Sequence, residues 1–339
     1  MTDVSAAPPT PVEYPSYLKD SDELPQPVRD IPLWSENYLT QAFDPATGVG
    51  FFFHLSRMPF NYDIWEGLFT CFLPGDRFLV ARDFSWDTND KGPGSNALRF
   101  EVVTPWQRWS KRFRGAALLV TGDQLRAGPI ADDSHVFVDA DLTFDNIGPV
   151  FDIGDMGEQF WARAHYEQHG QFTGHVSFDG THLGLGAERY DFTGTGLRDH
   201  SLGARDILKM NNHVWTHGEF PSGRLFMVMD VHTKVGPPFT YVVVGDQNGF
   251  TKVELTRPTS RIDDASQVFD PHELHFVGPN GPSVIKAQIL QAIPYSFTGP
   301  NEWSLGTHPN AHHLVIEAQT RFEWDGEVGY GLTERSVAF

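Results

Sequence analysis

Short runs of alternating apolar and polar residues fill the chain from Trp34 onwards, and Gly, Pro, Asn and Asp interrupt them. In the clearest run, residues 314–324, one set of alternate positions is mainly apolar and the other carries residues such as Glu317 and Arg321. Because successive side chains of a strand point to opposite faces, this run predicts a strand with one face on a core or cavity and the other in water. Residues 225–232 are apolar at both sets of positions until Asp230, which predicts a strand buried on both sides.

The same pattern predicts an all-β fold, because helical periodicity is almost absent. Turn sequences separate consecutive runs, as hairpins require: Pro74-Gly75-Asp76, Asp179-Gly180, Asn280-Gly281 and Asp325-Gly326. Further strands are expected over residues 49–57, 65–73, 77–84, 98–103, 115–121, 135–144, 174–178, 212–217, 241–245, 251–256, 272–277, 283–295 and 329–335. One small barrel cannot hold so many strands, so we expect two β domains of similar size.

The domain boundary is expected where the strand pattern lapses, over residues 150–165, and a short helical turn fits there. Residues 1–33 contain seven prolines and little apolar pattern, which predicts an extended arm or a mobile tail. We therefore predict an arm over residues 1–33, one β domain over residues 34–160 and a second over residues 161–339.

The composition narrows the classes of ligand. Asp and Glu number 44 against 25 Lys and Arg, and the resulting net charge of −19 argues against nucleic acid as a partner. No run of about 18 apolar residues and no basic or apolar leader is present, which favours a soluble, cytoplasmic protein without a membrane span. Cys71, as the single cysteine, excludes an intramolecular disulfide. With 27 Phe and 9 Trp, the surplus of aromatic residues either lines a cavity for a small apolar molecule or simply packs an aromatic core.

Ionisable groups are densest over residues 190–205, YDFTGTGLRDHSLGAR. Gly194 and Gly196 permit a tight bend or a close approach of another backbone, followed by an extended segment. Alternation then places Arg198, His200 and Leu202 on one face and Asp199 and Ser201 on the other. We expect Arg198 and Arg205 to be the charge partners of Asp199 and Asp206. Two interpretations stay open, a catalytic cluster and a buried ion-pair network that only pins the sheets together.

The segment TGLRDHSLGAR resembles the superfamily that includes carotenoid 1,2-hydratase (hydroxyneurosporene synthase) and the AttH-like proteins. HYEQHGQFTGHVSFDG before it, GEVGYGLTE near the end, and GVGFFFHLSRMP and WEGLFTCFLPGDRFLVAR in the amino-terminal half extend the resemblance to nearly everything after Trp34. The resemblance implies two lipocalin-like antiparallel β-barrels packed side by side, a cavity for an apolar molecule and no organic cofactor. Members commonly carry tryptophan where this chain has Leu202, which implies a reshaped pocket here.

The expected chemistry is acid–base catalysis on a terpenoid-like or steroid-like molecule, by hydration, dehydration, isomerisation or cyclisation at a C=C bond. Protonation of an alkene needs an acid held away from water, for which Asp199 is the first candidate and His200 the second. Arg198, Ser201 and Arg205 are expected to hold this pair from behind. Aromatic faces stabilise a developing carbocation. Candidates for contact with the substrate are Tyr190, Phe192, Leu202, Trp215 and Trp303.

Other chemistries fit the sequence less well. The segment HYEQH, from His165 to His169, places its glutamate one position late for a zinc-binding HExxH motif, so we expect no metal. DHSLG lacks the first glycine of a nucleophile elbow, and no Gly-rich phosphate loop is present. The role of the cluster His308, His312 and His313 and the presence of a homodimer stay undecided. The rival from another class is a lipocalin-like carrier without catalysis, whose cavity is lined by apolar groups alone.

Overall fold

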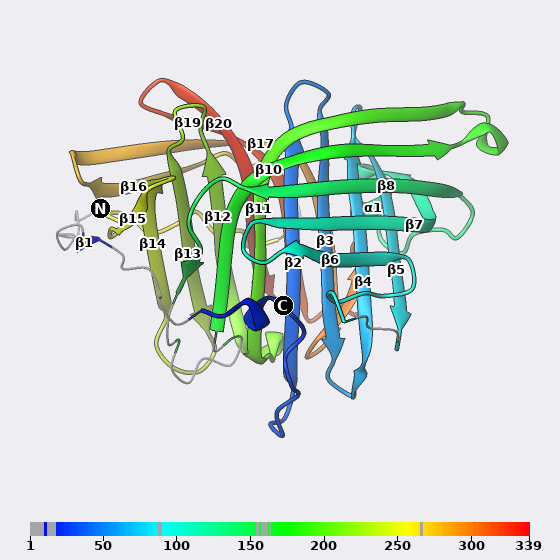
Figure 1. Cartoon of the computed structure of the whole chain (residues 1–339), viewed down its shortest axis with the longest axis horizontal. Coiled ribbons are helices and arrows are strands. Elements are labelled where there is room, and N and C mark those ends of the chain that lie inside the picture. The colour runs from blue at the N-terminus through cyan, green and yellow to red at the C-terminus, as the bar shows by residue number, and fades with distance from the viewer. Residues whose placement is uncertain are drawn as a thin grey trace. The chain divides into compact units, whose positions relative to one another are not determined.

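The computed structural model describes residues 10–11, 18–86, 90–153, 156, 162, 164–264 and 267–339. Two compact units divide the chain (Figure 1). The barrel unit comprises Pro15–Asp206, and the open-sheet unit comprises Ile207–Phe339 together with β1 (Thr10–Pro11) from the start of the chain. No helix in the described ranges is long and apolar enough to cross a membrane.

Eight strands of the barrel unit, as far as the described residues show, pair antiparallel into a closed ring. Around the ring they are β11 (Ala187–Ala204), β2 (Trp34–Asp44), β3 (Val49–Met58), β4 (Asn61–Leu73), β5 (Arg77–Ser85), β7 (Arg108–Thr121), β8 (His135–Asn146) and β10 (Ala164–Asp179). β6 (Leu98–Thr104) pairs with β7, and β9 (Phe151–Asp152) pairs with β10 outside the ring. The short helix α1 (Gly122–Ala127) follows β7, and the 3-10 turns η1 (Asp20–Glu23) and η2 (Thr181–Leu183) complete the unit.

The open-sheet unit forms a second antiparallel sheet, which curls as a half-barrel. Its strand order is β1, β15 (Gly249–Lys252), β14 (Phe239–Asp246), β13 (Leu225–Thr233), β12 (Met210–Glu219), β20 (Glu327–Ala338), β19 (His313–Trp324), β17 (Gly281–Gly299) and β16 (His272–Gly278). β18 (Glu302–Leu305) pairs with β17, and the turn η3 (Ile207–Lys209) precedes β12. The all-β, two-part lipocalin-like fold is therefore confirmed, with one barrel closed and the other sheet open.

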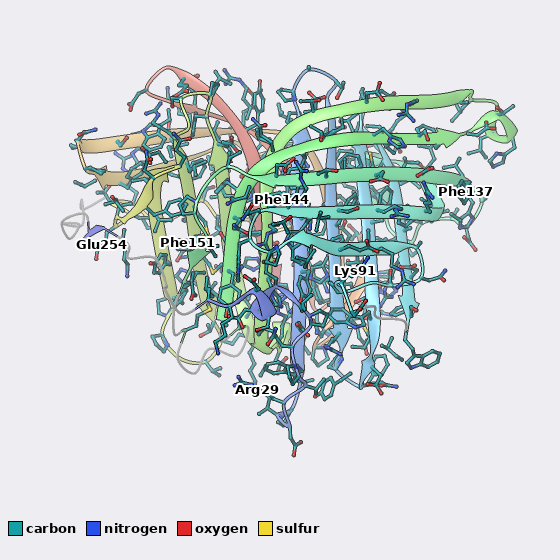
Figure 2. The ribbon with its side chains drawn as sticks, in the orientation of Figure 1. Arg29, Lys91, Phe137, Phe144, Phe151 and Glu254 are labelled. Carbon is teal, nitrogen blue, oxygen red and sulfur yellow. The ribbon has the colours of Figure 1, made fainter. Side chains whose placement is uncertain are left out.

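The barrel interior is filled by aromatic side chains. Alternate residues from around the ring converge on one core, and Phe53, Phe69 and Phe113 within it are at most 1% exposed. The rings of Phe69 and Phe113 stack with centroids 3.9 Å apart, and Phe53 lies 5.3 Å from Phe69. Figure 2 marks Phe137 and Phe144 on β8, which point to opposite faces, Phe137 exposed and Phe144 buried in the core. The aromatic surplus of this unit thus packs a core, which was one of the two alternatives from composition.

Two expectations about the chain's division need correction. The lapse near residue 160 lies between β9 and β10, which pair with each other in the same sheet, so the division of the chain falls at Asp206 and Ile207 instead. Residues 18–33 are an arm packed on the barrel, not a mobile tail, because Glu23 in η1 is 1% exposed and its carboxylate accepts hydrogen bonds from Trp106 N and Trp109 Nε1, both at 2.8 Å. Hydrogen bonds of Gln26 with Glu36 and Arg57 also join this proline-rich segment to the barrel.

Gly194 and Gly196 allow the backbone of a neighbouring strand to lie close to β11. β11 is continuous from Ala187 to Ala204, so the tight bend expected at Gly194 and Gly196 does not occur. A Cβ on Gly196 would lie 2.0 Å from the carbonyl oxygen of Gln41, and one on Gly194 would lie 2.2 Å from that of Phe43. Both positions therefore need glycine because β11 packs closely against β2.

Candidate functional site

The stretch Leu197–Ser201 of β11 is buried along its whole length. Its register is unbroken, with Arg198 opposite Thr40 on β2 and Gln168 on β10, and His200 opposite Tyr38 and Tyr166. Arg198 and His200 point into the barrel, where they contact the rings of Trp109 and Tyr38. Asp199 and Ser201 lie on the opposite face of the strand, as the alternation predicted.

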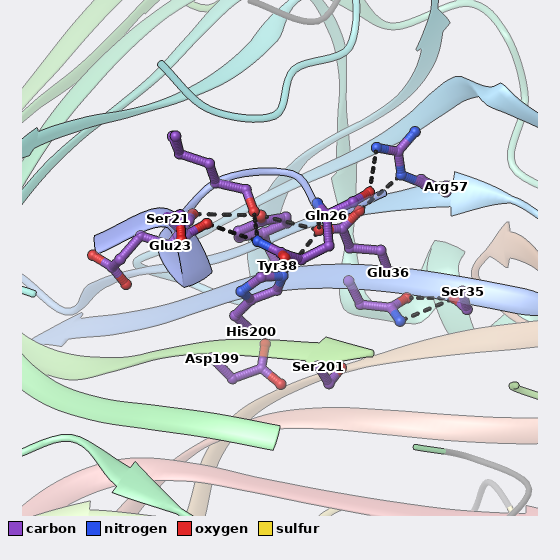
Figure 3. A network of polar contacts seen from close by, with 12 residues as sticks. Ser21, Glu23, Gln26, Ser35, Glu36, Tyr38, Arg57, Asp199, His200 and Ser201 are labelled. Atoms are coloured by element: carbon purple, nitrogen blue, oxygen red, sulfur yellow. Dashed lines mark hydrogen bonds and ion pairs between the residues drawn. The ribbon is translucent and has the colours of Figure 1, made fainter. Parts of the chain in front are cut away.

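His200 is held inside the barrel by a carboxylate and a phenol. Its Nε2 lies 3.1 Å from Glu36 Oε1, and its ring stacks on Tyr38 with centroids 3.9 Å apart. Arg57 Nε donates to the other Glu36 oxygen at 2.8 Å. In Figure 3, Glu36, Tyr38 and His200 gather on one side of the strand, and the Asp199 carboxylate lies on the other. Glu36 thus accepts from several donors and fixes the orientation of the imidazole.

The charges in this network shift two pKa values in opposite directions. Burial alone would raise the pKa of Glu36, but the hydrogen bonds and charges of His200 and Arg57 outweigh it and lower the pKa. Burial, together with the nearby Glu36 carboxylate, raises the pKa of Tyr38 well above its ordinary value. Glu36 is therefore ionised and Tyr38 is a neutral phenol at neutral pH, which suits a structural ion pair.

Arg198 is paired with Glu23, which corrects the expectation that it neutralises Asp199. The guanidinium contacts the carboxylate of Glu23 and the amide oxygen of Gln168, and it lies 5.0 Å from the ring centroid of Trp109. Lys111 lies on the same side, over the ring of Phe100 at 3.9 Å. Burial, reinforced by the charge of Arg198, lowers the pKa of Lys111 well below its ordinary value. One end of the barrel thus contains a buried polar cluster, in which Glu23 is the counter-ion of Arg198.

Asp199 is paired with a histidine from the neighbouring strand. Its Oδ2 lies 2.8 Å from His165 Nε2, and its Oδ1 accepts a hydrogen bond from Leu39 N at 2.8 Å. Glu167 Oε1 lies 3.2 Å from the same His165 nitrogen. Both oxygens of Asp199 are therefore engaged within the barrel unit, one by a backbone N–H and one by His165.

His165 gains basicity from these carboxylates. Burial acts to lower its pKa, but the contact with Asp199 and the charges of Glu167 and Asp199 outweigh it, so the pKa is raised. Arg205 opposes this effect by its charge, and its Nη2 donates to Ser201 Oγ at 3.0 Å. The cluster of His165, Glu167 and Asp199, with Ser201 and Arg205 beside it, therefore favours the protonated form of a buried imidazole, a candidate proton donor that sequence reasoning missed.

The aromatic residues expected to bind substrate are spread over both units. Phe192 lies in the barrel core against Phe51, and Tyr190 donates a hydrogen bond to Glu188. Leu202 is half-buried on β11. Trp303 packs on Phe297 in the open-sheet unit, at a centroid distance of 4.3 Å. Within each unit, these residues do not form a single cluster.

Trp215 shares one face of its strand with two ionisable residues. It is 5% exposed on β12, where strand alternation places it on the same face as His217 and Glu219. The ring centroids of Trp215 and His217 are 5.4 Å apart. Burial raises the pKa of Glu219 to about 8, and its Oε2 has no hydrogen-bond partner among the described residues. Glu219 is thus a buried carboxylic acid that is mostly protonated at neutral pH, at a position that residues 190–205 did not indicate.

Replacing Glu219 by glutamine is expected to stabilise the protein at pH 7 by about 1 to 3 kcal/mol. The folded carboxyl has a pKa raised from 4.5 to about 8, so folding of the wild type at neutral pH takes up a proton. The stability difference between variant and wild type should therefore be smallest below pH 4.5, grow by up to about 1.4 kcal/mol per pH unit, and level off above pH 8. Urea unfolding at several pH values measures it.

The matched control is Glu323→Gln, on β19 of the same sheet, whose side chain is 43% exposed. This control should show no comparable dependence on pH. A Glu219→Gln curve parallel to that of the wild type at all pH values would contradict the neutral carboxyl.

A second polar group on β12 also escaped sequence reasoning. His213 Nδ1 lies 2.5 Å from Ser336 Oγ on β20, and its Nε2 contacts the carboxylate of Glu334. The sequence places these residues more than a hundred positions apart, and only the pairing of β12 with β20 brings them together. No group of three or more His, Cys, Asp or Glu residues in the described part of the chain is arranged to hold a metal ion.

The comparisons with known proteins concern nearly the whole chain. The family described as "Domain of unknown function (DUF7064)" matches residues 19–337. No curated protein matches the sequence. Kievitone hydratase from Nectria haematococca is similar in structure, with a TM-score of 0.55, 12% identity and 97% of each chain covered. CghA has a TM-score of 0.52 at 12% identity, covering 91% of this chain and 89% of its own, and its complex with Sch210972 has a TM-score of 0.53. At such identities the similarity shows the fold alone.

Proposed function

The chain belongs to the DUF7064 family, and from that premise we propose that it is a cofactor-independent acid–base enzyme acting on an apolar molecule with a C=C bond. The reaction is a hydration, dehydration, isomerisation or cyclisation, and the substrate is terpenoid-like or steroid-like. The name of kievitone hydratase, which shares the fold, supports a hydratase among these reactions. The resemblance to carotenoid 1,2-hydratase and the AttH-like proteins supports the same class.

The observation that carries the proposal is the buried pair of His165 and Asp199, at 2.8 Å. Carbon is a weak base, so its protonation needs an acid that stays charged or protonated at neutral pH without bulk water around it. His165 is 5% exposed, and its raised pKa favours the protonated form, which supports it as the acid. In this proposal His165 donates the proton, Asp199 is a positioning residue that acts through it, and His200 serves the fold of the barrel.

Glu219 supports the same chemistry from the open-sheet unit. A carboxyl with a pKa of about 8 is mostly protonated at pH 7 and donates a proton more readily than water does. Trp215 shares its face of β12, and an aromatic face stabilises a developing carbocation. We propose Glu219 as a separate candidate acid within the open-sheet unit, with Trp215 as the aromatic residue on the same face of β12.

The rival function is a carrier for an apolar ligand, as in lipocalins that hold a molecule inside the barrel. Such a carrier needs an empty interior lined by apolar groups. In this chain, stacked phenylalanines and the side chains of Glu23, Arg198 and Lys111 are buried in the barrel unit. This packing argues against carriage of a ligand inside the barrel.

Incubating the protein with a panel of apolar terpenoid and steroid alkenes in D2O is expected to place deuterium on carbon in at least one compound. Protonation at carbon from a solvent-exchangeable acid transfers deuterium whether the product is an alcohol, an isomer or a cyclised molecule. Mass spectrometry detects each outcome, since hydration adds one D2O and isomerisation exchanges hydrogen for deuterium. The experiment needs no known substrate and covers hydration, isomerisation and proton-initiated cyclisation, the proposed reactions that form a C–D bond.

The control is the variant His165→Gln, which should remove the incorporation while the protein stays folded by circular dichroism. Compounds that bind in native mass spectrometry but gain no deuterium would instead establish a carrier. Incorporation that is unchanged in His165→Gln would assign the acid to another residue, Glu219 first.

A further inference from the structure

A pocket of about 400 Å³ opens in the open-sheet unit, and none of its lining residues belongs to residues 190–205. Its walls come from β13, from β14 and from the segment after β15, and they include Asp230, His232, Val242, Val253, Arg257 and Arg261. Figure 2 labels Glu254, which also lines it. The volume lies within the range of small-molecule sites.

One wall of the pocket is apolar. Val242 and Val253 are each 2% exposed and belong to the core of this unit, and Leu255 packs against the same core. Strand alternation puts Val242 on the same face of the sheet as the core residues Val244 and Val228. An apolar group placed in the pocket therefore contacts side chains already removed from water.

The polar wall is organised around Asp230, which is 4% exposed. Thr240 Oγ1 donates to Oδ1 at 2.8 Å and Thr259 Oγ1 donates to Oδ2 at 2.6 Å. His232 Nε2 lies 3.1 Å from Oδ1. With these three donors, both oxygens of Asp230 are satisfied within the protein, so its charge does not need a cation from the ligand.

Arg261 and Asp230 both contact the same imidazole nitrogen of His232. Its Nη2 lies 2.5 Å from His232 Nε2, the same atom that faces Asp230. An imidazole nitrogen carries either a hydrogen or a lone pair, so Nε2 either donates to Asp230 or accepts from Arg261. The buried carboxylate favours the protonated nitrogen, and the guanidinium is then left without an acceptor at this contact.

The charges around the pocket also favour an anionic ligand. Lys252, Arg257 and Arg261 line it, against the two carboxylates of Asp230 and Glu254, of which Asp230 is already satisfied. Arg257 is exposed and has no ion-pair partner among the described residues. An anion between Arg257 and Arg261 removes the conflict at His232 and neutralises this surplus.

We propose that this pocket binds a small amphipathic anion, with an apolar body on Val242 and Val253 and a carboxylate-type head group at Arg261 and Arg257. The planar guanidinium donates two parallel hydrogen bonds to such a head group, which a single ammonium group cannot do. The pocket shares no residue with the His165 cluster, so a test of anion binding here does not depend on the proposed reaction.

Isothermal titration calorimetry of the full chain with octanoate, 1-octanol and acetate tests the proposal. Octanoate is expected to bind at least about tenfold more tightly than 1-octanol, because the head group gains charge-assisted hydrogen bonds. Acetate is expected to bind more weakly than octanoate, because it leaves the valine wall uncovered. Equal affinity for octanoate and 1-octanol would overturn the anionic half of the proposal, and equal affinity for octanoate and acetate would overturn the apolar half.

Variants place the binding at this pocket. Arg261→Met and, separately, the exposed Arg257→Met are each expected to weaken octanoate binding by about tenfold or more and to leave 1-octanol unchanged. Arg321→Met, which changes an arginine of the same unit on β19, is the matched control and should bind like the wild type. Octanoate binding that survives both pocket variants would overturn the proposal, and Arg257→Met keeps the test valid if Arg261→Met fails to fold.

Discussion

Replacing Glu23 by alanine is expected to lower the free energy of unfolding by about 3 to 5 kcal/mol, the usual cost of leaving a buried charge without its partner. Glu23 is the carboxylate that faces Arg198, and both side chains are at most 3% exposed. The change also removes the acceptor of Trp109 Nε1 and of Trp106 N. The guanidinium of Arg198 would then be buried without its counter-ion.

Urea unfolding followed by tryptophan fluorescence measures this effect. Asp20→Ala, in the same 3-10 turn but exposed, is the control and should change stability by less than about 0.5 kcal/mol. Removing residues 1–30 should destabilise the barrel as strongly as Glu23→Ala. Unchanged midpoints for both would show that the segment is the dispensable arm that its prolines suggested.

The strands could be predicted from the sequence because alternation reports the environment of each side chain locally. Residues 314–324 lie within β19 (His313–Trp324), and residues 225–232 lie within β13, whose buried run from Leu225 to Val231 matches the apolar pattern on both faces. The turns at Gly75, Gly281 and Gly326 have positive φ and join consecutive strands. Local chemistry was sufficient for each of these elements.

The division of the chain could not be predicted in the same way. A lapse in the strand pattern near residue 160 marks a connection, and a connection within one sheet looks the same in sequence as one between two sheets. β10 and β11 close the ring by pairing with β8 and β2, far earlier in the chain. The ring closes because strands distant in the sequence pair with each other. The local pattern of apolar and polar residues does not report which strands pair.

The faces of β11 in the candidate site could be predicted from the sequence, but the partners of its side chains could not. Alternation correctly separated Arg198 and His200 from Asp199 along β11, because it depends on neighbouring positions alone. The partners of these residues, Glu23, Glu36 and His165, come from other elements and could not be deduced from spacing. The expected pairing of Arg198 with Asp199 fails because adjacent residues of a strand point to opposite faces.

Asp199→Asn is expected to lower deuterium incorporation into the substrate at neutral pH, by at most the factor of about 10² to 10⁴ that general acid catalysis contributes, because it weakens the acid function of His165 without removing His165. Asparagine keeps an oxygen for Leu39 N–H, but it removes the negative charge that raises the pKa of His165. Since the acid must be protonated, activity falls as pH rises through that pKa, and in the variant this fall should begin at lower pH. The rate and the pH profile are measured on the same D2O reaction.

His200→Gln is expected to show the opposite pattern, because His200 stacks on Tyr38 and contacts Glu36 inside the barrel. It should lose about 1 to 3 kcal/mol of stability and keep its activity per folded molecule. Asp199→Asn should stay closer to the wild type in stability, because Glu167 still faces His165 Nε2 and asparagine keeps an oxygen for Leu39 N–H. If instead His200→Gln lost activity at unchanged stability while Asp199→Asn kept it, the acid would face the barrel interior and His165 would be a structural residue.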